Sequence, residues 1–228
     1  MRIALAHKNL AFEIVPVHLR RDGGEQHSAG YRALNPQGLV PLLVDGGTAI
    51  AQSLAICEYL EETRPARPLL PGEARERAAV RSIVAAIACD IHPIDNLRVL
   101  QYLKRELGHP QETIDNWYRH WIRVGFEALE KVLAQRDAEL HCVGAQVSLA
   151  DAFLVPQVAN ARRLQLDLEP FPRIRSIDAH LRGLEPFQAS AIGFYERLGF
   201  FPEGPRFLEE GIEHQEMEMH LGSPWTAG

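Results

Sequence analysis

Several polar residues stand where they could bind a carboxylate. Ser53 lies at the expected start of a helix, where a hydroxyl, free N–H groups and the positive end of the helix dipole favour an anion. The same serine could equally be a simple N-cap, and the two roles are compatible. Arg98, Arg162 and Arg163 supply guanidinium groups, which hold carboxylates through paired hydrogen bonds. Serine at a helix start and arginine are residue types that can bind a carboxylate.

Two further features allow more than one interpretation. Val40–Pro41 is an X–Pro bond, which can be cis at low cost and would then turn the Val40 backbone N–H and C=O outward. A plain loop proline is the simpler interpretation of that dipeptide alone. Asp90 and His92 could begin a metal site, but no third ligand has suitable spacing, so we expect no metal. Without a metal, His92 is an ordinary histidine near a helix surface.

Composition excludes other classes of protein. The chain has 228 residues and a formal net charge of −6, so it is long enough for two domains and lacks the basic character of a nucleic-acid-binding protein. Its apolar runs are too short for a membrane span, and its first residues do not resemble a signal peptide. Cys57, Cys89 and Cys142 lie far apart, as expected of reduced thiols in the cytoplasm. We therefore expect a cytoplasmic protein that binds neither nucleic acid nor membrane.

Hydrophobic periodicity divides the chain into an α/β part and an all-helical part. The first part should contain a helix, a strand, a hairpin and a helix capped by Ser53, at Arg2–Lys8, Phe12–Leu19, Val40–Ala51 and Leu54–Glu62. After a Pro-rich linker at 64–68, five amphipathic helices are expected, at Glu73–Ile91, Asn96–Leu107, Ile114–Gln135, Ser148–Arg163 and Ile174–Leu184. Ser148 and Asp151 have the spacing of a capping box.

Four segments carry a family resemblance. They read Asn-Pro-Gln-Gly-Leu-Val-Pro at 35–41, Gln-Ser-Leu-Ala-Ile-Cys-Glu-Tyr-Leu at 52–60, Asp-Ile-His-Pro-Ile-Asp-Asn-Leu-Arg-Val-Leu at 90–100, and Ala-Asp-Ala-Phe-Leu-Val-Pro-Gln-Val-Ala-Asn-Ala-Arg-Arg at 150–163. In this order they resemble the zeta-class glutathione transferases (the maleylacetoacetate isomerase family), over residues 2–188. The resemblance implies a thioredoxin-like domain over 1–63, an all-helical domain over 69–188, glutathione as cofactor and a homodimer.

The resemblance also implies a reaction and a site. The reaction is the cis–trans isomerisation of maleylacetoacetate to fumarylacetoacetate, in which a thiolate adds to the double bond, the single bond rotates, and elimination follows. Arg98, Arg162 and Arg163 would hold the substrate carboxylates. The residues expected at glutathione are Gln26, Val40, Pro41, Gln52, Ser53, His92, Asn96, Leu97 and Arg98.

The sequence departs from this family at both ends. The family has a strand and a Ser-Ser-Cys turn before a helix like Arg2–Lys8, whereas the first serine here is Ser28. We therefore assign no catalytic hydroxyl, and expect a thioredoxin-like domain without its first strand and with impaired activity. Residues 189–228 instead resemble the end of a GNAT-family acetyltransferase, with a helix that ends at Gly199, Tyr195 at a catalytic position and a strand at 216–221. That strand could pair with the sheet edge left open.

Two other functions stay open. One is a non-catalytic glutathione-transferase-like module for binding or dimerisation. The other is an N-acetyltransferase, which is disfavoured because the Gly-rich loop for pyrophosphate is absent from the sequence. Gln26, Val40–Pro41, Gln52 and Ser53 favour the glutathione-dependent functions over the acetyltransferase.

Overall fold

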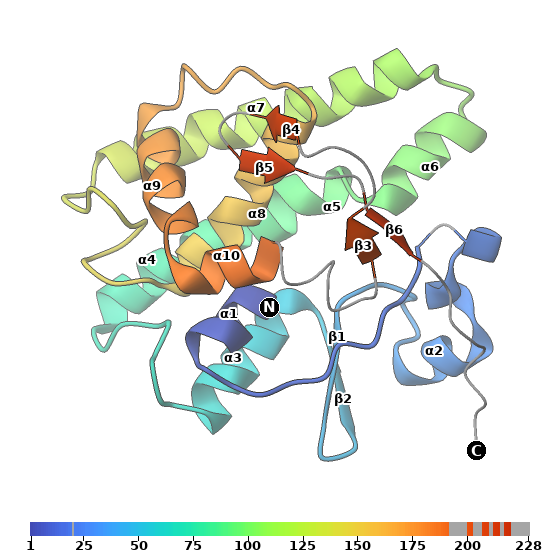
Figure 1. Cartoon of the computed structure of the whole chain (residues 1–228). Helices are drawn as coiled ribbons and strands as arrows, with labels where there is room; N and C mark the ends of the chain where they lie inside the picture. Colours follow the sequence, from blue (N-terminus) through green and yellow to red (C-terminus); the bar gives the residue numbers. More distant parts are fainter. Residues whose placement is uncertain (20, 192–199, 203–206, 210–211, 215–216, 220–228) are drawn as a thin grey trace.

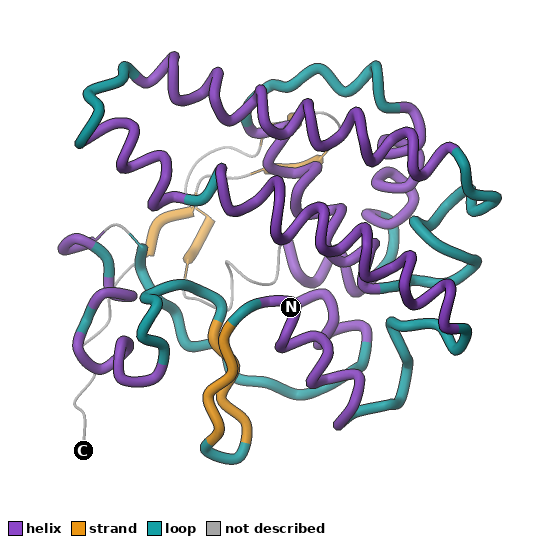
Figure 2. The backbone as a smooth tube through the Cα atoms, turned by 180° about the vertical axis from the view of Figure 1, so that it is seen from behind, coloured by secondary structure: helices purple, strands orange, loops and turns teal. Residues whose placement is uncertain are grey.

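A computed structural model of the chain describes residues 1–19, 21–191, 200–202, 207–209, 212–214 and 217–219. A small α/β unit lies beneath a larger helical unit, and a β-hairpin projects away from the helices (Figures 1 and 2). The α/β unit contains α1 Arg2–His7, 3₁₀ turns at Arg21–Gly23 and Glu25–His27, α2 Ala29–Leu34, β1 Leu42–Asp45, β2 Thr48–Ala51 and α3 Ser53–Thr63.

Helix α1 belongs to both units of the fold. Ile3 and Ala4 are buried in the large core of the helical unit, whereas Leu5 packs with Ile56 and Leu60 of α3 in a smaller core. The helix has no side-chain cap at its N-terminus. Its position therefore depends on burial of this apolar face, which stabilises short helices more than their intrinsic propensity does.

The β1–β2 hairpin forms as expected. Leu42 lies opposite Ala51, and Asp45 lies opposite Thr48 at the turn. Gly46 and Gly47 have φ values of 56° and 83°, the left-handed conformation that a two-residue hairpin turn requires.

The strand expected at Phe12–Leu19 is wrong. Residues 10–18 form neither helix nor strand, and Val15 is 75% exposed. Among the described strands, β1 pairs with β2 alone, so this segment has no neighbour to complete a ladder. Pro16 also lacks the N–H that a central strand must donate. The apolar residues of this segment predict a strand, but a strand forms only where a neighbouring strand can accept its backbone hydrogen bonds.

The helical unit agrees closely with the hydrophobic periodicity. Its elements are α4 Ala74–Ala85, a π-helical segment Ala86–Ile91, α5 His92–Ile94, α6 Leu97–Arg105, α7 Gln111–Ala134, α8 Leu149–Arg163, α9 Pro172–Arg182 and α10 Glu185–Ala191. Phe126, Leu154 and Ile174 are fully buried where these helices meet. Helix α7 lies so near the π-helical segment that a Cβ on Gly125 would be 2.3 Å from the Ile91 side chain.

A buried carboxylate fixes the start of α8, as the predicted capping box requires. Asp151 accepts hydrogen bonds from the backbone N–H and the hydroxyl of Ser148, at 2.7 and 2.8 Å. It also accepts the backbone N–H of Cys142 at 2.7 Å. Asp151 therefore ties the loop before α8 to the helix itself, and does more than cap one helix end.

Short strands follow the helical unit. β3 Phe200–Pro202 pairs with β6 Met217–Met219, and β4 Phe207–Glu209 pairs with β5 Ile212–His214. A strand is therefore confirmed at Met217–Met219, but its expected pairing with the edge at Leu42–Val44 or with residues 12–17 is wrong. The pairing is local because β3 is much nearer in the chain than β1, and closing a shorter loop costs less entropy. Tyr195, Gly199 and the helix expected before them lie outside the described residues, apart from the end of α10.

One carboxyl group is buried without a partner. Asp95 is 2% exposed, and neither of its carboxyl oxygens has a hydrogen-bond partner among the described residues. Desolvation by burial raises the pKa of Asp95 to about 8. The side chain is therefore mostly protonated at neutral pH, which removes the large cost of a buried unpaired charge.

Replacing Asp151 with alanine should destabilise the fold, because two buried N–H groups lose their acceptor. We expect a loss of about 2–4 kcal/mol in the free energy of unfolding, seen as a Tm lower by roughly 5–15 °C in calorimetry. Asp137→Ala, at an exposed position, is the matched control and should change stability by less than about 0.5 kcal/mol. Equal Tm values for the two variants would contradict this role.

Asp95→Asn should change how stability depends on pH. The raised pKa means that the native state keeps a proton that the unfolded chain has already released, so wild-type stability falls as pH rises from 5 to 8. The variant lacks this loss, so the stability difference should change by about 1.4 kcal/mol per pH unit. Urea unfolding at each pH measures it, with Asp115→Asn as control. Parallel profiles for wild type and Asp95→Asn would show that Asp95 is not buried as a neutral acid.

Candidate functional site

The loop between α2 and β1 is held by one backbone carbonyl. The carbonyl oxygen of Leu39 accepts the Tyr31 hydroxyl and the Asn35 side-chain amide, each at 2.7 Å. Asn35 is itself buried, and its Oδ1 accepts the backbone N–H of Gln37 at 3.2 Å. Tyr31 and Asn35 were not among the expected site residues, although the turn residues Asn-Pro-Gln-Gly at 35–38 were a signal that this loop is structured.

Gly38 lets this loop approach the turn that carries Gln26. Its φ is 62°, and a Cβ there would lie 2.9 Å from the ring of His27 and 3.1 Å from the backbone oxygen of Gln26. A larger residue would therefore be strained and would separate the two segments. Gln26 is buried, and its Nε2 donates to the backbone oxygen of Leu19 at 3.4 Å. Its Oε1 has no hydrogen-bond partner among the described residues.

The Val40–Pro41 peptide bond is cis. This confirms the interpretation of the dipeptide as a cis bend over that of a plain loop proline. Val40 is 42% exposed, and β1 begins directly after Pro41. The chain at this bend therefore stands at the surface beside the hairpin, where an extended peptide could pair with it.

The start of α3 differs from the expectation in one detail. The N-cap is Gln52, with a φ of 71°, and Ser53 is the first helical residue, so the prediction of Ser53 as N-cap is wrong. The Gln52 side chain makes no cap hydrogen bond and instead donates to Oε1 of Gln37 at 2.7 Å. Strand β2 ends at Ala51 and α3 begins at Ser53, so the chain must change direction at the single residue Gln52. The first N–H groups of α3 consequently have no side-chain cap, and such groups bind anions.

The residues expected from the helical unit lie on α5 and α6. His92 begins α5, and its side chain is exposed. Desolvation by the atoms packed around it still lowers its pKa, which favours the neutral imidazole. Asn96 is the N-cap of α6, where its side chain accepts the backbone N–H of Arg98 at 3.3 Å. Leu97 is half-buried and Arg98 is exposed. In Figure 1, α6 lies on the same side of the molecule as α2.

The two arginines at the end of α8 have partners of their own. Arg162 forms an ion pair with Asp178, a fully buried residue of α9 that also pairs with Arg182 at 3.0 Å. The guanidinium of Arg163 lies over the ring of Tyr118, 5.5 Å from its centroid. Arg162 therefore compensates a buried charge within the helical unit, which accounts for its presence without a substrate.

The described residues bring the expected site together in two groups. One group surrounds residues 35–41, which we call the Leu39-anchored loop, and consists of Gln26, Val40–Pro41, Gln52 and Ser53. The other group consists of residues between His92 and Arg98. Within the described part of the chain, no group of three or more His, Cys, Asp or Glu side chains could hold a metal ion. No described helix is both long enough and apolar enough to cross a membrane. The first group offers a backbone edge and a helix N-terminus, which suit an extended peptide with a free carboxylate.

Comparisons with known proteins show which family the chain resembles. Residues 1–63 match the family model described as glutathione S-transferase, N-terminal domain. The chain is 50% identical over 191 residues to a probable maleylacetoacetate isomerase of Vibrio cholerae, covering 84% of this chain and 88% of that protein.

Two solved structures share the fold. One is the holo structure of maleyl pyruvate isomerase, a bacterial zeta-class glutathione S-transferase, with a TM-score of 0.80 and 44% identity over 83% of this chain and 89% of that one. The other is maleylacetoacetate isomerase from Methylobacterium extorquens with bound malonate and GSH, with a TM-score of 0.79 and 38% identity over 83% and 88% of the two chains. This chain therefore belongs to the zeta-class glutathione S-transferase family, the family of the maleylacetoacetate isomerases, and has its glutathione-transferase fold.

Proposed function

We propose that this chain isomerises maleylacetoacetate to fumarylacetoacetate with glutathione as cofactor. The observation that carries the proposal is the Leu39-anchored loop, which sets the exposed Val40–Pro41 bend beside the uncapped start of α3. Family membership adds weight, since relatives at 44–50% identity are named maleylacetoacetate or maleylpyruvate isomerases.

The residues around the loop fit glutathione in their chemistry. Glutathione is a tripeptide with a γ-glutamyl carboxylate, and its cysteinyl backbone can pair with the Val40 backbone as a short added strand. The carboxylate suits the hydroxyl and first N–H groups of α3 at Ser53, which supply the positive end of a helix. The buried Oε1 of Gln26, which has no partner among the described residues, is an acceptor ready for an N–H of the ligand.

Other residues have more distant roles in this proposal. Gln52 contributes its side-chain donors from the loop side, while His92, Asn96 and Leu97 form the opposite wall. Arg98 is exposed and would hold a substrate carboxylate by bidentate hydrogen bonds, with Arg163 as a second candidate. Arg162 is the weakest of the three, because Asp178 already binds it.

When bound, glutathione supplies a thiolate that adds reversibly to the substrate's double bond, so that the bond can rotate before elimination. The part of this chain is to hold the tripeptide along the bend, to neutralise its carboxylate at α3, and to fix the substrate's carboxylates with Arg98. Holding glutathione and the substrate in a fixed relative orientation removes much of the entropic barrier to their reaction. No residue of this chain is assigned to stabilise the thiolate, and the Tyr31 hydroxyl is already used on Leu39.

The remaining expectations belong to the same proposal. We propose a thioredoxin-like domain over 1–63, a helical domain over 69–188, and an acetyltransferase-like segment over 189–228. The protein would act as a homodimer in the cytoplasm, on small molecules alone. The reduced thiols Cys57 and Cys142, both buried and free, are compatible with that compartment.

A second candidate function is a glutathione-binding module without turnover. The observation in its favour is that the Val40–Pro41 bend and the start of α3 would account for binding of the tripeptide, whereas the Tyr31 hydroxyl beside this loop already donates to Leu39. The two candidates differ in one measurement. An isomerisation assay with glutathione and maleylacetone, an analogue of the substrate, detects turnover, and calorimetry with glutathione detects binding. Binding without turnover selects the module, and absence of both rejects both.

Ser53→Ala should weaken glutathione binding roughly 10-fold, because a hydrogen bond to a charged carboxylate is lost. The KM for glutathione should rise by the same factor in the isomerisation assay. Ser82→Ala, which removes an exposed serine from α4, is the matched control and should leave both values unchanged. Unchanged binding in Ser53→Ala would place the carboxylate elsewhere.

Arg98→Ala should raise the KM for the anionic substrate by roughly 10- to 100-fold, because a charge-assisted bidentate contact is lost. Arg105→Ala removes an equally exposed arginine from the other end of α6 and should have no such effect. Steady-state kinetics at saturating glutathione measures both variants. If Arg98→Ala and Arg105→Ala have the wild-type KM, Arg98 does not bind the substrate.

A further inference from the structure

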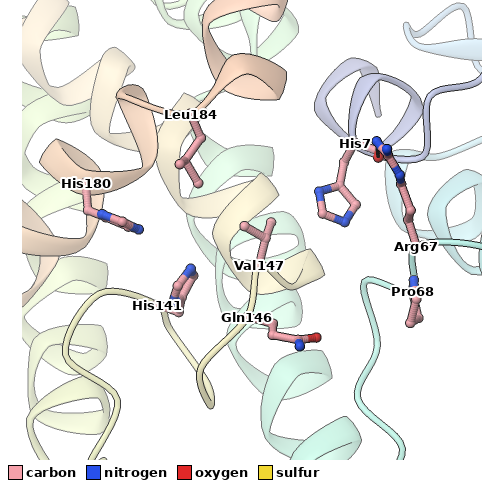
Figure 3. Close-up of a pocket in the computed structure, with 8 residues that line it drawn as sticks. All are labelled: His7, Arg67, Pro68, His141, Gln146, Val147, His180 and Leu184. Carbon is pink, nitrogen blue, oxygen red and sulfur yellow. Dashed lines mark hydrogen bonds between the residues drawn. The ribbon is translucent and has the colours of Figure 1, made fainter.

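One cavity is lined by none of the residues assigned to glutathione or substrate. It has a volume of about 480 Å³ and lies where α1, the segment after α3, the loop before α8 and α9 come together (Figure 3). This is within the range of small-molecule sites. Its walls include three histidines, His7, His141 and His180, each from a different segment of the chain.

Four polar side chains of this cavity are cationic or can become so, and a fifth, Gln146, contributes a neutral amide. Figure 3 shows the rings of His7, His141 and His180 directed toward a common space, with Arg67 at its edge. Arg67 is permanently charged, and its Nη1 donates to the backbone oxygen of His7 at 3.3 Å. The described residues that line the cavity include no aspartate or glutamate.

The acidic residues around the cavity are already bound to other groups. Glu61 forms an ion pair with Lys8 at 2.7 Å and accepts the backbone N–H of Leu69 at 3.1 Å. Asp151 is engaged by Ser148 and by the backbone of Cys142, as described above.

Acids on the neighbouring helices do not face the cavity either. Asp178 of α9 pairs with Arg162 and Arg182. Helix α10, which contacts α1, carries one acidic residue, the exposed Glu185. The positive charge of the cavity therefore has no matching negative charge among the described residues that line it.

The surroundings of His7 and His141 disfavour the protonated imidazole. Burial lowers the pKa of His7, and the neighbouring Arg67 and Lys8 lower it further, against a smaller opposing effect of Glu61. Burial also lowers the pKa of His141, as does His180, against the opposing effect of Asp151. The rings of His141 and His180 lie edge to face with centroids 5.2 Å apart. An anion beside the ring of His141 would favour its protonated form.

Apart from the Gln146 amide, the other walls of the cavity are apolar. Pro68, Val147 and Leu184 line it together with the carbon atoms of the imidazole rings. An inorganic anion would leave these side chains in contact with water, whereas an organic anion would cover them.

We propose that this cavity binds a small organic carboxylate, with the carboxylate against the histidines and Arg67 and the hydrocarbon or aromatic body against Val147 and Leu184. Binding of the anion favours the charged imidazoles, so it takes up protons and strengthens as pH falls. The site is separate from the proposed isomerase site, and the proposal does not rest on that function.

Calorimetric titration with phenylacetate tests the proposal on the full chain. We expect binding about 10-fold tighter at pH 6 than at pH 8, with proton uptake seen as a dependence of the heat on the buffer's ionisation enthalpy. Phenylacetamide has the same body without the charge and should not bind measurably. Inorganic phosphate should bind more weakly than phenylacetate. Phosphate binding equal to or tighter than phenylacetate binding would overturn the assignment to organic carboxylates.

Variants locate the site. His180→Gln and Arg67→Asn should each weaken phenylacetate binding about 10-fold at pH 6; asparagine suits position 67, where φ is 51°. His109→Gln, at an exposed position between α6 and α7, is the matched control and should bind as wild type does. If the variants fold poorly, the wild-type protein is titrated with phenylacetate and the NMR signals of its imidazoles are followed. We expect the chemical shifts of His7, His141 and His180 to change and that of His109 to stay constant.

Three further results would overturn the proposal. The first is that phenylacetate gives no heat of binding at pH 6. The second is that S-methylglutathione displaces phenylacetate while His180→Gln binds phenylacetate as the wild type does. The third is that phenylacetate binding does not depend on pH. The second result would place the ligand at the glutathione site. Because S-methylglutathione reports on that site separately, failure of this proposal is distinguishable from failure of the proposed function.

Discussion

The carbonyl of Leu39 is the interaction on which the candidate site depends. Tyr31 and Asn35 both donate to it, so the chain between α2 and β1 is fixed immediately before the Val40–Pro41 bend. The Gln52–Gln37 hydrogen bond then connects this loop to the start of α3. Without these contacts, the exposed backbone edge and the helix N-terminus would not keep one geometry, and a ligand that spans both would have to order them on binding.

Much of the fold was predictable because its signals are local. The helical unit follows from a 3.6-residue apolar period, and its capping box from the spacing of Ser148 and Asp151. The hairpin follows from Gly46 and Gly47. The segment Phe12–Leu19 was not predictable in the same way, because whether an apolar run becomes a strand depends on a partner elsewhere in the chain. The pairing of β6 with β3 was not predictable for the same reason, because the choice of partner strand is not encoded locally.

Candidate residues for the site could be named from the sequence, but the contacts that hold them could not. Family resemblance pointed to Val40–Pro41, Gln52 and Ser53, and the cis bend is present. The hydrogen bonds of Tyr31 and Asn35 to Leu39 come from the tertiary fold and have no sequence signal beyond a turn-rich segment. The buried, unpartnered carboxyl of Asp95 and the cavity of three histidines could not be foreseen either, since each gathers groups from segments that are far apart in the chain.

A crystal structure of the chain with reduced glutathione tests the central claim most directly. The account predicts that the cysteinyl backbone of the tripeptide pairs with the Val40 backbone, and that the γ-glutamyl carboxylate lies at the Ser53 hydroxyl and the first N–H groups of α3. Glutathione bound at any other surface, with the Val40 backbone and the start of α3 left to solvent, would contradict it.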